Sequence, residues 1–421
     1  MEGGPLDSIY IYGGNFLRGE TRIQGSKNAA LPILAATLLV EGTCVIQNCP
    51  RITDVYHMQN LLQELGCRVS WKGSTVMVNA AGISDYRMAG ESVTRMRSSI
   101  MLLGALLGRL GEAAMAYPGG CVIGRRPIDL HLSALKEMGV DITEQEQMFT
   151  ARVKSLKGMD YRLPFPSVGA TENVLLAAVL AEGTTVLHNA AREPEIEALC
   201  EFLMEAGADI RGAGSARLVI RGVRRLHEAS YSVPADRIVA GTYLAAALAA
   251  GGSIFLEKAP SGQMKAVIGM AREMGSSVIA NPEGIGVHAV RRMDACPYLK
   301  TDVYDGFPTD LQSPMMAALA VARGRSIIEE NIFENRFRIV NDLKRMGADI
   351  RTADNRACIR GVEGLKGAEA WAQELRGGAA LVVAGLAAEG LTVIRNRHYI
   401  ERGYEDICKD MRRLGADIRS G

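Results

Sequence analysis

The sequence lacks the features that mark membrane proteins, secreted proteins and disulfide-rich proteins. Its 421 residues contain no apolar run as long as the roughly 18 residues of a membrane-spanning helix. The N-terminus has no basic segment followed by an apolar one, so we expect no secretory signal. The eight cysteines are scattered and form no CxxC pair, which is typical of reduced thiols and not of a secreted disulfide scaffold. We therefore expect a soluble, cytoplasmic protein that does not enter a membrane.

A large net charge of either sign is also absent. The 48 Lys and Arg residues against 47 Asp and Glu residues leave a net charge of +1, so any anion must bind to a local cluster, and a nucleic-acid partner has little support. No His/Cys cluster has metal-ligand spacing, and no Walker or dinucleotide glycine motif follows an expected strand. We infer neither a metal nor a nicotinamide cofactor, and no obligate protein partner is evident.

What the sequence does contain is a unit that occurs six times. A glycine after a short apolar segment recurs at intervals of 66 to 72 residues, and a second glycine, after a longer helical segment, keeps nearly the same period. This period exceeds the roughly 20 to 50 residues of common solenoid repeats, so closed lobes are favoured over an open array. The two series are Gly42, Gly111, Gly183, Gly252, Gly324 and Gly390, and Gly66, Gly139, Gly207, Gly275, Gly347 and Gly415.

The third copy shows the local signals of each element. Pro194 suits the first position of a helix, and Gly207 suits the left-handed residue that ends it. The segments 184–189 and 216–222 have the alternation and β-branched content of strands. The alanine-rich segment 243–250 has no polar face, so we expect such helices to be buried, with sheets facing solvent. Six copies divide most simply into two lobes of three, with a ligand site in the cleft between them.

Residues that depart from the repeat are the candidates for function. Lys27 and Asn28 precede an apolar helix, where a cation and an amide can form an anion seat; the alternative is a surface lysine beside a helix cap. Cys121 follows a Gly-Gly pair and precedes Arg125 and Arg126. The glycines argue against the alternative of a rigid core cysteine, and the arginines favour the thiolate. We therefore favour a mobile loop that carries a reactive thiol and an anion-binding arginine.

Further candidates lie in the second half of the chain. Asp310 is placed either to cap the following helix or to act as a general base, and the two roles are compatible. Arg336, taken alone, would be a salt-bridged surface arginine. Six cations lie near element ends in both lobes, and charge-assisted hydrogen bonds of roughly 1.5–3 kcal/mol each would let them hold a small anion such as a phosphorylated carboxylate. They are Lys27, Arg97, Arg126, Arg336, Arg376 and Arg402.

At these residues the chain resembles the UDP-N-acetylglucosamine enolpyruvyltransferase (1-carboxyvinyltransferase) family. The matching motifs are GSKNAALPILAATLL, RMRSSI, PGGCVIGRRPIDLHL, SVGATEN, AAREPEIEAL, PADRI, GFPTDLQ, FENRF, LRGGAALV and ERGYE. The resemblance implies transfer of the enolpyruvyl group of phosphoenolpyruvate to the 3-hydroxyl of UDP-N-acetylglucosamine, with release of phosphate by addition–elimination. This is the first committed step of peptidoglycan synthesis, and no metal or organic cofactor is expected for it.

The resemblance also implies the fold. We expect an α/β protein, a two-lobe inside-out α/β barrel built from six βαβαββ-type units, three per lobe. One lobe would comprise residues 26–234 and carry the cysteine loop and much of the UDP-sugar site. The other would comprise residues 1–25 and 235–421 and carry the base and several phosphoenolpyruvate-binding arginines.

Roles for single residues follow from the same resemblance. Asp310 would be the base for the sugar hydroxyl, and Lys27 would act with it and with Cys121. Cys121 would be the cysteine linked to proton donation, a covalent phosphoenolpyruvate adduct, product release and alkylation by fosfomycin. The phosphate would be bound by Lys27, Arg126 and Arg402, with Arg336 and Arg376 around the carboxylate. The UDP-sugar contacts would be Asn28, Arg97, Pro127, Ile128, Asp129, Leu130, Ser167, Val168, Gly169, Asp310 and Ile332.

Two departures from the family pattern bear on geometry. Glu374 and Glu401 stand where the family commonly has aspartate, which keeps the charge and lengthens the side chain by one methylene. We expect an effect on closing geometry and rate, not on reaction class. Two other readings stay open: a transferase for another acceptor such as shikimate 3-phosphate, and a weakly active relative that binds a UDP-sugar or a protein partner as a regulator. The loop cysteine argues against the first, and intact Lys27, Cys121 and Asp310 argue against the second.

Overall fold

The computed structural model describes residues 7–88, 91–94, 96–119 and 128–421. Contacts divide these residues into two compact units. Unit 1 contains Ala235–Gly421 together with the N-terminal segment that ends at Gln24, and unit 2 contains the described residues from Gly25 to Pro234.

Unit 2 contains three four-stranded sheets of one topology. In each, the first two strands are parallel and the remaining neighbours are antiparallel. In order, the sheets are β14 (Ser230–Ser232), β3 (Thr43–Gln47), β5 (Thr75–Asn79) and β4 (Arg68–Lys72); β6 (Arg87–Met88), β7 (Glu112–Ala116), β9 (Met148–Arg152) and β8 (Asp141–Glu144); and β10 (Asp160–Arg162), β11 (Thr184–His188), β13 (Arg217–Arg221) and β12 (Asp209–Arg211).

Unit 1 repeats this topology in three sheets, with the N-terminal segment supplying one strand to each of two of them. In order, the sheets are β2 (Leu17–Arg22), β15 (Gly252–Glu257), β17 (Gly284–Ala289) and β16 (Ser277–Asn281); β18 (Tyr298–Lys300), β19 (Arg325–Glu329), β21 (Arg356–Arg360) and β20 (Asp349–Ala353); and β23 (Glu369–Trp371), β25 (Leu391–Arg395), β1 (Ser8–Tyr12) and β26 (Asp417–Ser420). A short parallel pair joins β22 (Leu365–Lys366) to β24 (Ala388–Glu389).

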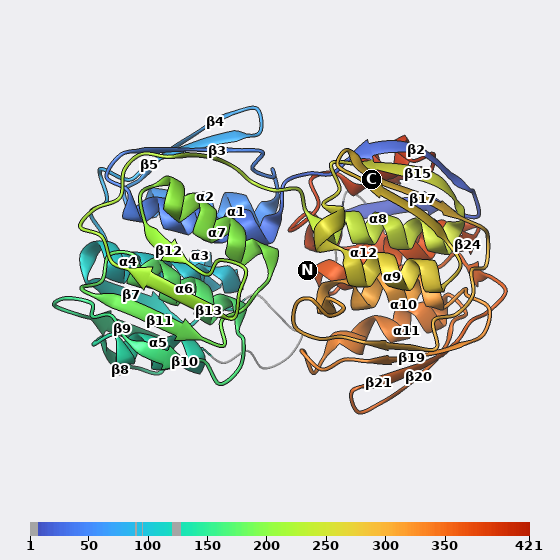
Figure 1. Ribbon diagram of the computed structural model, residues 1–421. Helices are drawn as coiled ribbons and strands as arrows, with labels where there is room; N and C mark the ends of the chain where they lie inside the picture. Colours follow the sequence, from blue (N-terminus) through green and yellow to red (C-terminus); the bar gives the residue numbers. More distant parts are fainter. Residues whose placement is uncertain (1–6, 89–90, 95, 120–127) are drawn as a thin grey trace. The chain divides into compact units, whose positions relative to one another are not determined.

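Apolar helices form the interior of each unit. In unit 1, α8, α10 and α12 pack on one another, and Figure 1 shows them between the strands β15 and β17 on one side and β19 to β21 on the other. In unit 2, α4 packs on both α1 and α6. All residues of α8 are buried, as a helix without a polar face requires.

The unit 2 helices are α1 (Lys27–Ala36), α2 (Thr53–Glu64), α3 (Glu91–Thr94), α4 (Met101–Leu110), α5 (Asp129–Glu137), α6 (Val168–Ala178) and α7 (Pro194–Glu205). The unit 1 helices are α8 (Arg237–Ala250), α9 (Lys265–Glu273), α10 (Gln312–Leu319), α11 (Val340–Arg345), α12 (Leu375–Ala387) and α13 (Ile407–Arg413).

Short 3₁₀ turns carry several of the candidate residues. They are η1 (Thr37–Leu39), η2 (Arg97–Ile100), η3 (Ser261–Gln263), η4 (Thr309–Leu311), η5 (Arg336–Ile339) and η6 (Arg397–Tyr399). On the sheets, buried and exposed residues alternate along strands such as β13 and β21. The outer faces of these sheets are therefore in solvent and the helices lie inside, as the sequence predicted.

The repeated glycines explain how each copy turns from helix to strand. The six glycines of the second series all have positive φ, between 84° and 99°, a conformation that is free of a steric penalty only for glycine. In the first series the exception is Gly42, where a Cβ would lie 2.5 Å from the side chain of Glu228. That carboxylate accepts a hydrogen bond from the backbone N–H of Thr43 at 2.7 Å. At this position the close approach of a side chain, and not a positive φ, accompanies the glycine.

The cysteines in the described part of the chain are all free. Burial raises the pKa of the Cys44 and Cys67 thiols to about 11, and that of Cys200 and Cys408 to about 12. These thiols are protonated at neutral pH and are weak nucleophiles. Cys121 lies outside the described residues.

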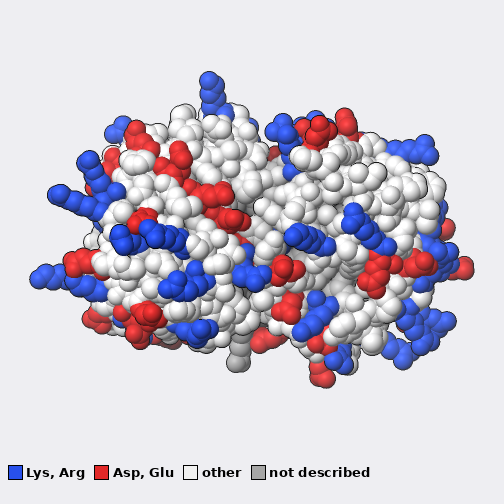
Figure 2. Space-filling model, viewed as in Figure 1, with Lys and Arg blue, Asp and Glu red and all other residues white. Residues whose placement is uncertain are grey.

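The surface shows no large field of one sign in the view of Figure 2, where basic and acidic side chains are interspersed. This agrees with the balanced composition of the chain. None of the helices in the described ranges combines the length and the apolar character that crossing a membrane requires.

Candidate active site

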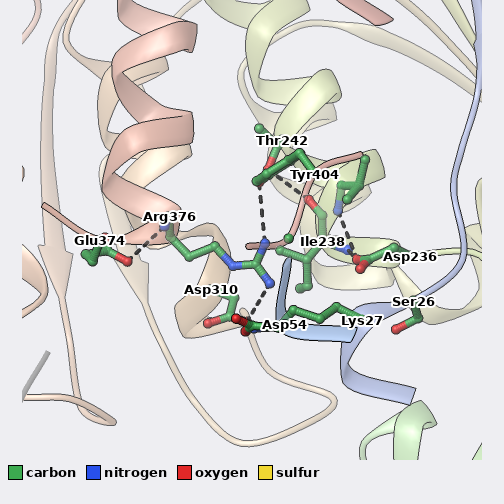
Figure 3. A network of polar contacts seen from close by, with 12 residues as sticks. Ser26, Lys27, Asp54, Asp236, Ile238, Thr242, Asp310, Glu374, Arg376 and Tyr404 are labelled. Carbon is green, nitrogen blue, oxygen red and sulfur yellow. Dashed lines mark hydrogen bonds and ion pairs between the residues drawn. The ribbon is translucent and has the colours of Figure 1, made fainter. Parts of the chain in front are cut away.

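In unit 1, the side chain of Asp310 joins two arginines from distant parts of the chain. Its Oδ1 accepts a hydrogen bond from Nη2 of Arg336 at 2.6 Å, and its Oδ2 accepts one from Nη2 of Arg376 at 3.1 Å. Both arginine side chains are buried, 3% and 4% exposed, whereas that of Asp310 is 25% exposed. The carboxylate is thus held by two buried guanidinium groups and is itself partly exposed. Figure 3 shows the contact with Arg376.

The capping interpretation of Asp310 is wrong. Helix α10 begins at Gln312 with Leu311 at its N-cap, and no side chain forms a capping bond there. Asp310 lies within the preceding turn η4 and directs its carboxylate to the arginines. The interpretation of Arg336 as a surface arginine is also wrong, because its side chain is buried against Asp310.

Glu374 completes this cluster. Its side chain caps α12 by accepting hydrogen bonds from the backbone N–H groups of Arg376, at 2.8 Å, and of Gly377. One of its oxygens also lies 3.7 Å from Nη1 of Arg336. A capping carboxylate at a helix N-terminus satisfies donors that the helix itself leaves unpaired. Glu374 thus links the start of α12 to the guanidinium of Arg336.

The far side of the Arg376 guanidinium contacts a buried tyrosine. Its Nη1 lies 3.5 Å from the hydroxyl of Tyr404, which in turn lies 2.8 Å from Oγ1 of Thr242 (Figure 3). Burial tends to lower the pKa of this guanidinium, but the charge of Asp310, the Tyr404 hydroxyl and Asp236 outweigh it and raise the pKa above its ordinary value. Arg376 is therefore a permanent cation in a buried position.

Arg402 lies in the turn between η6 and α13, close in the chain to Tyr404. This turn packs against the first turn of α12: a Cβ at Gly403 would lie 2.8 Å from the side chain of Leu375, and a Cβ at Gly378 would lie 2.6 Å from that of Ile400. The glycines permit this close approach. The segment that carries Arg402 is thus packed onto the helix start that carries Arg376.

In unit 2, Lys27 is the first residue of α1, and its ammonium group bonds to Oδ2 of Asp54 at 3.1 Å. Asp54 is buried and belongs to the first turn of α2. Ser26 caps α1, and Asn28 follows Lys27 in its first turn. The sequence suggested an anion seat or a surface lysine beside a helix cap, and the structure gives Lys27 a buried carboxylate partner that neither suggestion included.

Arg97 begins η2, directly before the apolar helix α4, and its Nη1 donates to the carbonyl oxygen of Pro118 at 3.3 Å. It lines a cavity of about 400 Å³, which also contains the predicted UDP-sugar contacts Ile128 and Asp129. Leu130 follows in α5. The other lining residues are Tyr117, Pro118, Leu132, Ser133, Lys136 and Glu144.

Three more predicted contacts form the N-terminus of α6. Ser167 is its N-cap and accepts a hydrogen bond from the N–H of Ala170, while Val168 and Gly169 form the first turn. A Cβ at Gly169 would lie 2.8 Å from the ring of His131. That ring accepts a hydrogen bond at Nδ1 from Asn173 at 2.8 Å, if the amide donates through Nδ2. An N-terminus of this kind carries the N–H groups and dipole that favour a phosphate.

The structure therefore brings together Asp310, Arg336 and Arg376 within unit 1, and Arg97, Ile128 and Asp129 around one cavity of unit 2. Ile332 lies after β19, where its backbone N–H donates to Glu330 at 2.8 Å. The meeting of both groups at one cleft stays a prediction. Cys121, Arg126 and Pro127 lie outside the described residues. Within the described ranges, no three His, Cys, Asp or Glu side chains are grouped so that they could hold a metal ion.

Sequence reasoning missed several polar residues of these clusters. They include Asp54, Thr242, Glu330 and Tyr404. Asp54 lies in the first turn of a helix, and an acidic residue at such a position indicates an interaction with the helix dipole. This pattern does not indicate that a lysine elsewhere in the chain is its partner. For the others no sequence pattern gives the long-range partner.

The sequence pattern of the EPSP synthase (3-phosphoshikimate 1-carboxyvinyltransferase) family matches residues 11–411. The chain belongs to the enolpyruvyl transferase family. Among its relatives, the UDP-N-acetylglucosamine 1-carboxyvinyltransferase 2 of Caldanaerobacter subterraneus subsp. tengcongensis is 46% identical over 413 residues, which cover 98% of this chain and 99% of that protein. The UDP-N-acetylglucosamine 1-carboxyvinyltransferase of Oleidesulfovibrio alaskensis is 44% identical over 414 residues, with coverage of 98% and 99%.

Solved structures agree with the fold. The enolpyruvyl transferase NikO from Streptomyces tendae superposes with a TM-score of 0.88 at 25% identity, covering 98% of each chain. The EPSP synthase of Acinetobacter baumannii gives a TM-score of 0.73 at 21% identity, over 98% of this chain and 99% of that one, and shows the fold alone. The predicted family and the predicted architecture of six repeated units are thus confirmed.

Proposed function

We propose that this enolpyruvyl transferase acts as a UDP-N-acetylglucosamine 1-carboxyvinyltransferase. It transfers the enolpyruvyl group of phosphoenolpyruvate to the 3-hydroxyl of UDP-N-acetylglucosamine and releases phosphate, the first committed step of peptidoglycan synthesis. The observation that carries this proposal is identity of 43–46% over 98% of the chain with proteins of that name. Solved EPSP synthases are only 20–21% identical over the same share.

Asp310 is the base in this proposal. Addition of the sugar hydroxyl to phosphoenolpyruvate requires removal of its proton at the reacting oxygen, and the partly exposed carboxylate of unit 1 can accept it. A carboxylate held by two guanidinium groups is a weak base, because the paired charges stabilise its ionised form. The carboxylate and phosphate of phosphoenolpyruvate compete for Arg336 and Arg376, so substrate binding releases Asp310 to act as the base.

The cations stabilise the anionic substrate and the departing phosphate. Arg336 and Arg376 bind around the carboxylate, and Arg402 contacts the phosphate from a turn packed on the same helix start. Lys27 and Arg126 bind the phosphate from the other lobe, with Asp54 orienting the ammonium group of Lys27. Fixed cations of this kind stabilise the developing charge without rearranging during the reaction.

Cys121 donates the proton to the methylene carbon of phosphoenolpyruvate and is the residue that fosfomycin alkylates. Two features support this role: the adjacent glycines and arginines in the sequence, and the contrast with the buried thiols, whose raised pKa values make them unreactive. No step requires a metal ion or an organic cofactor, since the cations of the chain balance the substrate's charge.

The UDP-sugar binds mainly to residues 26–234, the lobe that carries Cys121. The N-terminus of α6 at Ser167, Val168 and Gly169 suits the diphosphate, and the cavity at Arg97, Ile128 and Asp129 offers a cation and apolar walls. The remaining sugar contacts of the proposal are Asn28, Pro127, Leu130, Asp310 and Ile332. The enzyme works in the cytoplasm, in agreement with the free cysteines of the described ranges.

The test compares two acceptors. Phosphate release from phosphoenolpyruvate is measured with UDP-N-acetylglucosamine and, in parallel, with shikimate 3-phosphate, and the product is identified by mass spectrometry. We expect turnover with the UDP-sugar and none above background with the shikimate ester. Turnover with the ester alone would make the chain a transferase for that acceptor. UDP-sugar binding without turnover would favour a regulatory relative.

A further inference from the structure

The buried carboxylate of Glu330 lies behind the proposed base. Glu330 directly follows β19 and is 3% exposed. Its Oε1 accepts hydrogen bonds from the backbone N–H groups of Ile332, at 2.8 Å, and Phe333, at 3.0 Å. Both of its oxygens also lie 3.0 Å from Oγ1 of Thr309. One side chain therefore fixes two segments that are more than twenty residues apart.

These two segments carry opposite halves of an ion pair. Thr309 immediately precedes Asp310 in η4. Phe333 lies under the guanidinium of Arg336, whose carbon is 5.1 Å from the ring centre. Arg336 in turn bonds to Asp310 at 2.6 Å. The contacts close a ring from Glu330 through Thr309, Asp310, Arg336 and Phe333 back to Glu330.

The ring limits how far the carboxylate of Asp310 can move. The segment after β19 has no regular secondary structure between Glu330 and the start of η5, and two of its backbone N–H groups are bonded by Glu330 instead. Hydrogen bonds to a charged acceptor are worth roughly 1.5–3 kcal/mol each. When the substrate draws Arg336 away from Asp310, the bonds from Glu330 are the contacts of the ring that still hold both segments.

We propose that Glu330 is a positioning residue for the transfer reaction, which acts through Thr309 on Asp310 and through Phe333 on Arg336. This rests on the proposed role of Asp310 as the base. Glu330 itself does not touch the reacting atoms. It sets the distance and direction from which Asp310 receives the proton of the sugar hydroxyl, and misplacement of a base by about 1 Å costs up to roughly a hundredfold in rate.

The test removes one hydroxyl from the ring. Thr309→Val has nearly the shape of threonine but cannot donate to Glu330, whereas Thr309→Ser keeps the hydroxyl. We expect Thr309→Val to lower kcat by at least about tenfold, within the roughly hundredfold that a 1 Å misplacement can cost, with little change in the KM for UDP-N-acetylglucosamine. Thr309→Ser should restore most of the rate.

The matched control is Thr301→Val. Thr301 is fully buried, whereas Thr309 is partly buried, and the Thr301 hydroxyl accepts a hydrogen bond at 3.0 Å from the backbone N–H of Asn331, the residue after Glu330. It therefore supports the same segment from outside the ring. We expect this variant to lose at least as much stability as Thr309→Val, because its hydroxyl is more deeply buried, and to keep its kcat and its pH profile.

The pH profile of kcat/KM separates positioning from general weakening. A carboxylate that leaves Arg336 loses the guanidinium that favours its ionised form, so the acid limb of the profile should move to higher pH in Thr309→Val and stay in place in Thr301→Val. Equal kcat values and equal profiles for the two valine variants would overturn the proposal. If Thr309→Val does not fold, Glu330→Gln, which retains Oε1 and removes the second acceptor, is measured by the same criteria.

Asp310→Asn is assayed beside them, so that the two failures can be told apart. Near-normal turnover of Asp310→Asn would overturn the role of Asp310 and, with it, this inference. An inactive Asp310→Asn together with a fully active Thr309→Val would overturn the positioning role of Glu330 alone.

Discussion

Replacement of Glu172 by glutamine should stabilise the protein, and the gain should grow with pH. Glu172 lies in α6 and is 1% exposed, and neither of its carboxylate oxygens has a hydrogen-bond partner among the described residues. Burial, followed by the charges of Glu195 and Glu193, raises its pKa well above the ordinary value. The neutral acid is therefore the form that fits the folded protein.

The size of the effect follows from the difference in proton binding. The unfolded chain loses the proton of Glu172 near its ordinary pKa of about 4.3, whereas the folded chain keeps it to much higher pH. Across this window the free energy of unfolding falls by about 1.4 kcal/mol per pH unit, and it stops falling once pH exceeds the folded-state pKa. The loss therefore grows with every pH unit above the ordinary pKa for as long as the folded chain keeps the proton. Glu172→Gln removes the ionisation and should regain this amount.

The assay is equilibrium unfolding in urea at pH 4.5, 6 and 7, followed by the same spectroscopic probe for every variant. We expect Glu172→Gln to match the parent protein at pH 4.5 and to exceed its stability progressively at pH 6 and pH 7. The exposed Glu205, at the end of α7, provides the control Glu205→Gln, which should give no such trend. A difference between Glu172→Gln and the parent that is constant across pH would refute the reasoning.

Cys121→Ser should abolish most covalent labelling by fosfomycin in intact-protein mass spectrometry, and unchanged labelling would show that another residue reacts. Asp310→Ala should lower kcat by at least about a hundredfold, the usual contribution of a general base, while calorimetry still detects UDP-sugar binding; near-normal turnover would remove Asp310 as the base. Glu374→Ala, which deletes the cap of α12, should cost about 1 kcal/mol of stability, whereas Glu401→Ala, which deletes an exposed ion pair with Arg397, should cost a few tenths of a kcal/mol. Equal melting temperatures for these last two variants would contradict the capping role.

The repeated fold was predictable because its signals are local. A glycine with positive φ after a helix, a proline at the start of α7 and an alanine-rich helix without a polar face each restrict the backbone within a few residues. The regular recurrence of these signals then indicated six similar units. The topology of the four-stranded sheets, in which N-terminal strands complete sheets of unit 1, depends on pairing over the whole chain and was not visible in the residues themselves.

The candidate site was predictable in its members but not in its contacts. The motifs identified Asp310, Arg336 and Arg376, yet no local rule predicts that residues 26 and 66 positions apart share one carboxylate. The same holds for Lys27 and Asp54, whose ion pair joins two helix starts. Glu330 was missed because its importance lies in its buried hydrogen bonds, and its sequence context, between an acidic residue and an asparagine, resembles an ordinary solvated turn.

The most direct measurement is a crystal structure of the Asp310→Asn variant with UDP-N-acetylglucosamine and phosphoenolpyruvate both bound. The account predicts that Lys27 from one lobe and Arg336 and Arg376 from the other lie within hydrogen-bonding distance of the same phosphoenolpyruvate molecule, and that the sugar 3-hydroxyl lies against residue 310. Substrate bound by the cations of one lobe alone, with those of the other lobe still paired to protein carboxylates or turned to solvent, would contradict it.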